Sequence, residues 1–217
     1  MRRFIWVFLS ALLFFIALSC FIYFQSQATA TFNQTRDRLI LIASNSALSI
    51  SADEIFNIPL EDRSEGSPEY LTVYQKLLKI KEANPAVKYA YIMTSTNQPG
   101  ILKYVVDADP VPQIITAKCP TALPGDKYDA SRFPEMLEGF ERPSADKKIS
   151  FDEWGMFISG YAPITDINGR IVAILGVDFD ASNLKTMQNK AHFAGQVALF
   201  MGILSFILLG FSFAKPR

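Results

Sequence analysis

Two long apolar runs near the ends of the chain dominate its pattern of hydrophobic and polar positions. Phe4–Phe24 and Phe193–Ala214 contain no charged residue, and each has the roughly 20 residues that a helix needs to cross a bilayer. We predict that both are transmembrane helices. A cleaved signal peptide is the alternative for the first run, because Arg2 and Arg3 form a basic start. Its apolar core is, however, longer than the usual ~7–15 residues of such peptides.

Helical spacing continues after the first apolar run. Residues 25–50 contain no Pro or Gly, and apolar residues recur there at helical intervals, so the first helix is predicted to continue outward as one long helix. Ser51 and Glu54 match a capping box, which predicts a short helix that stops near Pro59.

A further helix is predicted from Ser67 to Ala83. Ser67-Pro68-Glu69 supplies an N-cap, a proline at the first helical position and an acid in the first turn. Asn84-Pro85 ends the helix, because proline disfavours the helical conformation in the residue before it. The predicted buried stripe is Tyr70, Val73, Tyr74, Leu77 and Ile80.

Alternation of apolar and polar positions predicts two hairpins in the second half of the chain. Val87–Ser95 and Ile101–Asp107 form the first. Met156–Ile164 and Arg170–Phe179 form the second, joined by Asp166-Ile167-Asn168-Gly169. Asn-Gly between apolar runs is the strongest short-range signal for a tight hairpin.

The connection between the hairpins, Ala108–Ser150, is rich in Pro and Asp, and we predict that it contains one short helix around 131–139 and no strands. A connection of this length is typically a functional lid or loop. After the second hairpin, Asp180–Asn183 offers a cap for a helix that runs into the second apolar run. The element order predicts an α+β fold with an antiparallel sheet and helices gathered on one side.

Charge orients this arrangement. The chain has 21 basic and 21 acidic residues, but Arg2, Arg3, Lys215 and Arg217 lie at the termini and every acid lies between the apolar runs, which leaves a formal charge of −4 there. By the positive-inside rule both termini are predicted to be cytoplasmic. The predicted parts are a cytoplasmic end 1–3, a span 4–24, an outer domain 25–192, a span 193–214 and a cytoplasmic end 215–217.

The acidic balance and the cysteine content exclude several classes of function. A mildly acidic outer domain argues against nucleic acid as a partner. Cys20 lies within the first span and Cys119 is the second of only two cysteines, so the outer domain holds no internal disulfide and no Cys-rich zinc site. The loop acids match no EF-hand spacing, and we expect no metal and no cofactor.

Four motifs in the outer domain resemble a known family. They are ANPAVKYAYIMT (83–94), YVVDADP (104–110), PGDKYDAS (124–131) and DEWGMFISGYAPITDINGRIVAILGVD (152–178). In this order they resemble the extracytoplasmic PAS-like sensor domains called Cache domains, which stand at the N-termini of bacterial diguanylate cyclases, histidine kinases and chemoreceptors. The resemblance covers roughly residues 39–184.

The resemblance implies a PAS-like central antiparallel sheet, a long N-terminal helix and a small-molecule pocket between the sheet and the long connection. It also implies homodimers whose membrane helices pair, and a bacterial inner-membrane receptor with a periplasmic sensor. Such receptors continue into a cytoplasmic output domain, whereas only Lys215, Pro216 and Arg217 follow the second span. We therefore expect a sensory fragment, or a sensor that signals through a separate partner.

Aromatic and acidic residues on the predicted strands are the candidate ligand contacts. They are Tyr89, Tyr91, Met93, Tyr104, Asp107, Trp154, Tyr161 and Asp178. An ordinary core position is the alternative for the tyrosines and for Trp154. Asp107 and Asp178 each end an apolar strand, where a carboxylate must be paired or must meet a ligand. By analogy with the family, Asp178 is the predicted contact for a ligand amine, with helix or turn capping as the alternative.

A catalytic function has little support in the sequence. Nucleophile motifs, phosphate-binding glycine loops and metal-ligand spacings are absent, and the single histidine, His192, lies at the edge of the second span. The prediction is the sensor portion of a membrane receptor for an amino acid, an amine or a carboxylate. The alternatives are a structural membrane tether or dimerisation module without a ligand, and a membrane-anchored hydrolase.

Overall fold

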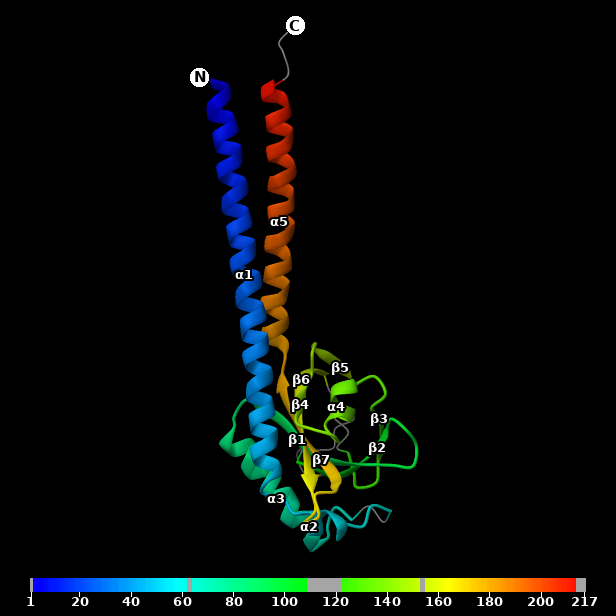
Figure 1. Cartoon of the computed structure of the whole chain (residues 1–217). Helices are drawn as coiled ribbons and strands as arrows, with labels where there is room; N and C mark the ends of the chain where they lie inside the picture. The colour runs from blue at the N-terminus through cyan, green and yellow to red at the C-terminus, as the bar shows by residue number, and fades with distance from the viewer. Residues whose placement is uncertain (1, 62–63, 109–121, 153–154, 214–217) are drawn as a thin grey trace. The chain divides into compact units, whose positions relative to one another are not determined.

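The computed structural model describes residues 2–61, 64–108, 122–152 and 155–213 (Figure 1). The chain divides into two compact units. One unit is Gln34–Ala181, and the other combines Met1–Asn33 with Ser182–Arg217. Cys119 and Trp154 lie outside the described residues.

The unit that combines the chain ends is built from two apolar helices. α1 (Arg2–Ala47) is one continuous helix, as predicted, and α5 (Ser182–Phe213) contains residues 193–213 of the second apolar run. Among the described residues, these are the two helices long and apolar enough to cross a membrane. In this unit Ser205 Oγ donates to the carbonyl oxygen of Ser10 at 2.8 Å.

Glycines on α5 allow the two helices to approach closely. A Cβ at Gly195 would lie 2.9 Å from the ring of Phe21, and one at Gly202 would lie 3.2 Å from the ring of Phe14. Each glycine therefore leaves the space that an aromatic ring of α1 occupies. Small residues at such an interface are typical of helix pairs in membranes, where van der Waals packing drives association.

The other unit contains the two short helices that the sequence predicts. α2 (Ala52–Phe56) begins at the Ser51 capping box, in which Ser51 N–H donates to Glu54 Oε2 at 2.9 Å and Glu54 N–H donates to Ser51 Oγ at 3.3 Å. α3 (Pro68–Ala83) begins after its Ser67 N-cap and ends at Asn84, and its predicted stripe is buried. Capping chemistry thus fixes both helix starts.

All strand pairs in the sheet are antiparallel, which confirms the predicted α+β, PAS-like fold. The strands are β1 (Val87–Ser95), β2 (Ile101–Asp107), β3 (Lys127–Asp129), β4 (Ser144–Ala145), β5 (Ser150–Asp152), β6 (Gly155–Thr165) and β7 (Ile171–Asp180). Their order is β3-β2-β1-β7-β6-β4, with β5 also paired to β6. β1 and β7 therefore lie at the centre, where both faces of the sheet can be covered.

The connection between the hairpins differs from the prediction of a strandless loop. β3 pairs with β2 and β4 pairs with β6, so this connection extends both edges of the sheet. Its helix, α4 (Pro134–Glu138), is shorter than predicted. Strands of two or three residues are too short to show an alternating pattern, which explains why the sequence does not reveal them.

The two faces of the sheet carry different partners. On one face, a Cβ at Gly160 of β6 would lie 2.7 Å from Leu39 of α1, so α1 packs directly on the strand backbone. Gly160 therefore serves close packing between the helix and the sheet. The other face carries a core cluster of aromatic and apolar side chains from β1, β2, β6, β7 and α4. The candidate site lies on this second face.

Candidate functional site

Two neighbouring cross-strand rows at the centre of the sheet carry the candidate site. The first row is Tyr89, Asp178 and Ser159, and the second row is Asp107, Tyr91, Gly176 and Tyr161. Side chains alternate between faces along a strand, so both rows project from the same face. The antiparallel register therefore brings residues from four strands to one place.

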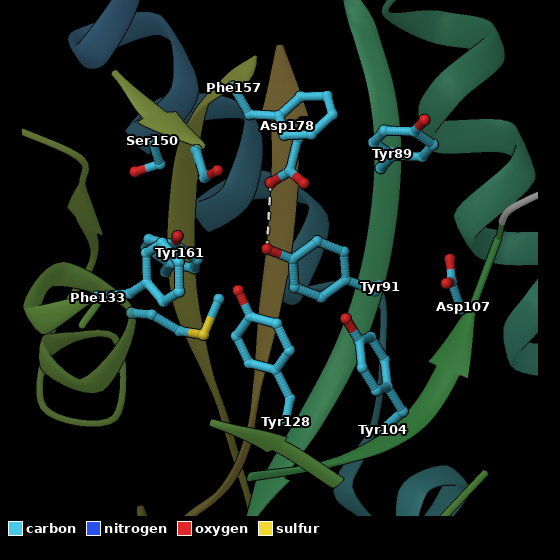
Figure 2. A pocket seen from close by; sticks show the side chains of 12 residues that line it. Tyr89, Tyr91, Tyr104, Asp107, Tyr128, Phe133, Ser150, Phe157, Tyr161 and Asp178 are labelled. Atoms are coloured by element: carbon cyan, nitrogen blue, oxygen red, sulfur yellow. Dashed lines mark hydrogen bonds between the residues drawn. The ribbon is translucent and has the colours of Figure 1, made fainter. Parts of the chain in front are cut away.

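Gly176 makes room for the central ring of this site. A Cβ at Gly176 would lie 2.3 Å from the ring of Tyr91, so the phenol of Tyr91 can lie across β7 only because position 176 has no side chain. From there its hydroxyl reaches the carboxylate one row away, and Tyr91 Oη donates to Asp178 Oδ1 at 3.1 Å (Figure 2).

The two rows form the floor of a pocket. Its described lining is Tyr89, Tyr91, Tyr104, Asp107, Tyr128, Phe133, Met136, Ser150, Phe157, Ser159, Tyr161 and Asp178. The volume of the pocket is about 30 Å³, which is room for about two water molecules. Figure 2 shows the hydroxyls of Tyr91 and Tyr128 on the side of the pocket where the Asp178 carboxylate lies.

Aromatic rings form one wall of the pocket. Tyr91 meets Tyr104 with ring centroids 6.0 Å apart, Tyr104 meets Tyr128 at 6.1 Å, and Tyr128 stacks on Phe133 at 5.7 Å. Edge-to-face and stacked pairs at these distances are favourable. The wall joins β1 and β2 to β3 and to the start of α4, so Tyr128 and Phe133 of the connection between the hairpins form part of the pocket lining.

Burial controls the ionisation of the groups in the pocket. It raises the pKa of Tyr91 well above its ordinary value, and the nearby Asp178 carboxylate adds to this effect. Burial likewise raises the pKa of Tyr161, with a further contribution from the charges of Asp146 and Asp178. The two phenols therefore stay neutral at physiological pH, and Tyr91 and Tyr161 donate hydrogen bonds to the carboxylates of Asp178 and Asp146.

Asp107 closes the second row at the edge of β2. Its side chain is buried and lines the pocket, and its backbone carbonyl accepts a hydrogen bond from Tyr70 Oη of α3 at 3.2 Å. Burial raises the pKa of Tyr70 to about 12. α3 thus fixes the backbone that presents Asp107 to the pocket.

The structure brings six of the predicted contact residues together. Tyr89, Tyr91, Tyr104, Asp107, Tyr161 and Asp178 all line the pocket. Tyr91, Tyr104 and Tyr161 also belong to the core cluster, so the two interpretations of these tyrosines, core and pocket, describe different parts of the same side chains. Trp154 lies outside the described residues, and its role stays a prediction.

Met93 is the described candidate that does not reach the pocket. It is fully buried in the core cluster. Met93 follows Tyr91 on the same face of β1, but two residues of a strand extend about 7 Å, which places it beside the pocket, further along the strand. Its pairing partners there are Tyr104 and Ile174.

Six residues line the pocket but are not among the contacts predicted from the sequence. They are Tyr128, Phe133, Met136, Ser150, Phe157 and Ser159. Phe157 and Ser159 alternate with Tyr161 along β6, so the period of a strand could have found them. The other four lie in the connection between the hairpins, where no periodic pattern indicates which side chains face the sheet.

Comparisons with known proteins match the fold and not the sequence. No protein-family profile and no curated protein sequence matches the chain. The sensor domain of the histidine kinase DctB from V. cholerae matches with a TM-score of 0.51 and 13% identity, over 82% of this chain and 59% of that one. This match shows that the chain shares the fold of the DctB sensor domain.

Two further solved structures match less well. The ligand-binding domain of the Campylobacter jejuni chemoreceptor Tlp3 in complex with 4-methylisoleucine has a TM-score of 0.47 and 16% identity, over 82% of this chain and 63% of that one. A domain of a sensory box/GGDEF family protein from Vibrio parahaemolyticus has a TM-score of 0.46 and 12% identity, over 81% and 64%. The chain spans about three fifths of the length of these sensor domains.

Proposed function

We propose that the chain is the sensor portion of a bacterial membrane receptor, and that its pocket binds a small molecule with a positively charged amine. The observation that carries the proposal is the charge of the pocket. Its described lining holds two carboxylates, Asp107 and Asp178, and no Lys, Arg or His. Two aspartates with no basic side chain beside them in the described lining attract a cation and repel an anion, so an ammonium group is the ligand chemistry that best matches this lining.

Asp178 is the proposed primary contact. It lies in the central strand β7, and its carboxylate already accepts a hydrogen bond from Tyr91. The tyrosine rings around it can also contact a cation through their faces, since aromatic rings attract cations. A ligand carboxylate, by contrast, would meet the same two aspartates as a like charge.

Binding requires the pocket to enlarge. The space among the described lining residues holds about two water molecules, so a larger ligand has to displace side chains of that lining. The ligand would therefore favour an open arrangement over the closed one, and the free energy of this preference limits how strongly it can shift the equilibrium. We propose that this shift is the signal that the receptor passes to its spans, to a cytoplasmic output domain or to a partner.

A screen of ligands by thermal unfolding tests this proposal. The full chain in nanodiscs is heated with matched concentrations of short primary amines, amino acids and short carboxylic acids. A ligand that binds the folded state raises the melting temperature. We expect amines to raise it and simple carboxylic acids to have no effect.

Two variants make the screen specific. Asp178→Asn is expected to abolish the response to amines, whereas Asp166→Asn, which removes an equal charge at the β6–β7 turn, should keep it. A rise in melting temperature with carboxylic acids alone would contradict the proposal that the pocket binds an amine. No response to any class would favour the membrane tether, and conversion of a compound would favour a hydrolase.

A further inference from the structure

Asp146 is a buried carboxylate directly behind the pocket, and it does not itself line it. Its side chain is 2% exposed. It lies immediately after β4, in a segment that pairs with β6. It lies outside the four family-like motifs of the sequence, and aspartate is rarely buried to this extent unless it is paired.

Three groups that line the pocket donate hydrogen bonds to this carboxylate. Asp146 Oδ2 accepts from Ser159 N–H at 3.0 Å and from Ser150 Oγ at 3.2 Å, and Asp146 Oδ1 accepts from Tyr161 Oη at 3.3 Å. The Asp146 N–H also donates to the Ser159 carbonyl at 2.9 Å. Asp146 therefore holds β6, Tyr161 and the start of β5 in the positions that shape one side of the pocket.

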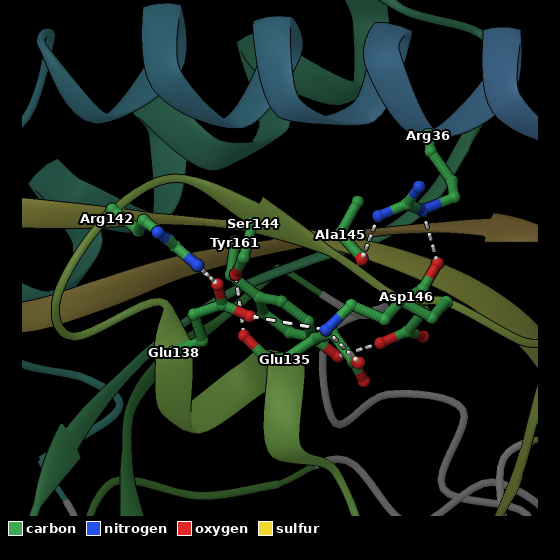
Figure 3. A network of polar contacts seen from close by, with 9 residues as sticks. Arg36, Glu135, Glu138, Arg142, Ser144, Ala145, Asp146 and Tyr161 are labelled. Atoms are coloured by element: carbon green, nitrogen blue, oxygen red, sulfur yellow. Dashed lines mark hydrogen bonds and ion pairs between the residues drawn. The ribbon is translucent and has the colours of Figure 1, made fainter.

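The backbone of the same residue is held from the other side by α1. Arg36 Nε donates to the carbonyl of Asp146 at 2.8 Å, and Arg36 Nη2 donates to the carbonyl of Ala145 at 3.2 Å. Figure 3 shows the guanidinium reaching from α1 to these two successive carbonyls. The planar guanidinium fork fixes the direction of both bonds, which a lysine could not do.

We propose that Asp146 is a positioning residue of the pocket and that, through the Arg36 guanidinium, it ties the pocket to α1. A ligand that displaces Tyr161 or Ser150 must change the bonds of Asp146, and the β4 segment can then move only with Arg36 or by breaking its two bonds. Because α1 also contains the first apolar run, this path leads from the pocket to a predicted span. The claim that a ligand moves this connection rests on the proposed function. The connection of the pocket to α1 through Asp146 and Arg36, called the tie below, does not.

Protonation of Asp146 would change the hydrogen bonds of its carboxylate without a ligand. An ionised carboxylate accepts all three bonds, whereas a protonated one donates through its own O–H, so one of its two hydroxyl partners, Ser150 or Tyr161, must then accept a hydrogen bond instead of donating one. Burial raises the pKa of Asp146 to about 6, and the charge of Glu135 adds to this, against the opposing hydrogen bonds.

The charged groups around Asp146 come from α4, from α1 and from the residue that follows Asp146. Glu135 lies on α4 and pairs with Lys147 at 3.2 Å, Lys147 also reaches Glu138 at 3.8 Å, and Arg36 faces the Asp146 backbone from α1.

Amide hydrogen exchange of the full chain in nanodiscs tests the tie. Protection factors are measured at about pH 5 and about pH 7.5, on either side of the Asp146 pKa. In the wild type, we expect protection of β6 residues 156–161 and of α1 residues 34–40 to change together, by about tenfold. In Asp146→Asn, which cannot ionise, neither segment should change with pH.

A variant of Arg36 distinguishes a connection between the pocket and α1 from a change that is confined to β6. In Arg36→Gln the β6 change is expected to remain and the α1 change to disappear, whereas Arg38→Gln, on the same helix, should behave as the wild type. A pH-dependent change that survives in Asp146→Asn would overturn the role of Asp146. An α1 change that survives in Arg36→Gln would overturn the tie. No ligand enters this experiment, so its failure is distinct from failure of the proposed amine site, and Arg36→Gln still decides it if Asp146→Asn does not fold.

Discussion

Tyr91 and Asp178 are both buried, and a hydrogen bond joins them. The phenol would lose its hydrogen bond to water, and the carboxylate would lose its hydration, but the 3.1 Å bond between them satisfies both groups in part. A buried polar group left without its partner costs ~1–3 kcal/mol. The pair therefore contributes to stability as well as to the proposed site.

A double-mutant cycle measures this pair. We predict that Tyr91→Phe and Asp178→Asn are each destabilising by about 1–2 kcal/mol and that the double variant costs less than their sum, because the second substitution removes an interaction that is already lost. Chemical denaturation of the chain in detergent gives the three free energies of unfolding. As a control, Tyr91→Phe combined with Asp166→Asn should be additive. Additivity for the first pair as well would show that the bond contributes nothing to stability.

Asp146 predicts a dependence of stability on pH. Its pKa is about 6 in the folded state against an ordinary value of 3.8, so between these values the folded state binds more protons than the unfolded state. Stability from this group is therefore present at low pH and lost as pH rises through about 4 to 6, by about 3 kcal/mol in total. Asp146→Asn should remove this loss.

The measurement is the difference in unfolding free energy between wild type and Asp146→Asn across that range. Relative to the variant, the wild type is expected to become less stable as pH rises. Asp166→Asn is a control of opposite sign, because hydrogen bonds from the Arg170 and Asn168 backbone and the Arg170 side chain lower the pKa of Asp166. A flat difference for Asp146→Asn would refute the raised pKa.

The part of the site on regular strands could be predicted from the sequence, and the part on the connection could not. Tyr89, Tyr91 and Asp178 follow from strand period and from the cost of burying a carboxylate. Asp146 lies beyond a two-residue strand, and its partners Ser159 and Tyr161 come from another strand. Only the tertiary structure shows that they meet.

At the scale of elements, α1 and β6 are packed through a glycine. A Cβ at Gly160 would lie 2.8 Å from the backbone carbonyl of Leu39 as well as close to its side chain, so the helix itself would have to move. We predict that Gly160→Ala destabilises the chain by about 1–3 kcal/mol, the usual cost of overpacking. Gly66→Ala is the control, because nothing lies within 4 Å of that position.

Thermal unfolding of both variants checks this prediction, with amide exchange of residues 36–43 as a second measurement. Loss of protection in α1 for Gly160→Ala, and not for Gly66→Ala, would locate the effect at the helix. Equal stability of the two variants would contradict the close packing of α1 on β6.

The helices and long strands of the fold follow from local chemistry. The Ser51 capping box, the Ser67-Pro68 helix start and the Asn168-Gly169 turn each determine an element boundary within a few residues. The short strands β3 and β4 depend instead on pairing with β2 and β6. Such pairing is a long-range property, and a two- or three-residue segment has too little pattern to predict it.

At the scale of the whole molecule, the apolar runs and the terminal charges predict that the chain crosses the membrane twice. Both termini should be cytoplasmic and residues 25–192 should lie outside, because basic residues stand between each apolar run and the nearer terminus. Ile167, at the tip of the β6–β7 hairpin, is 98% exposed and is a suitable reporter of the outer domain.

Labelling of single cysteines in intact cells tests this topology. In a chain without its native cysteines, Ile167→Cys should react with a membrane-impermeant maleimide, whereas a cysteine added before Arg2 or after Arg217 should react only after permeabilisation. Cys20 alone should stay unlabelled in both conditions, since it lies within the first apolar run. Reaction of either terminal cysteine in intact cells would place that terminus outside. If only the N-terminal cysteine reacts in intact cells, the chain crosses the membrane once, through the second apolar run. The N-terminal end of α1 would then lie outside the cell, and the Arg36 contact could not connect the pocket to a membrane span.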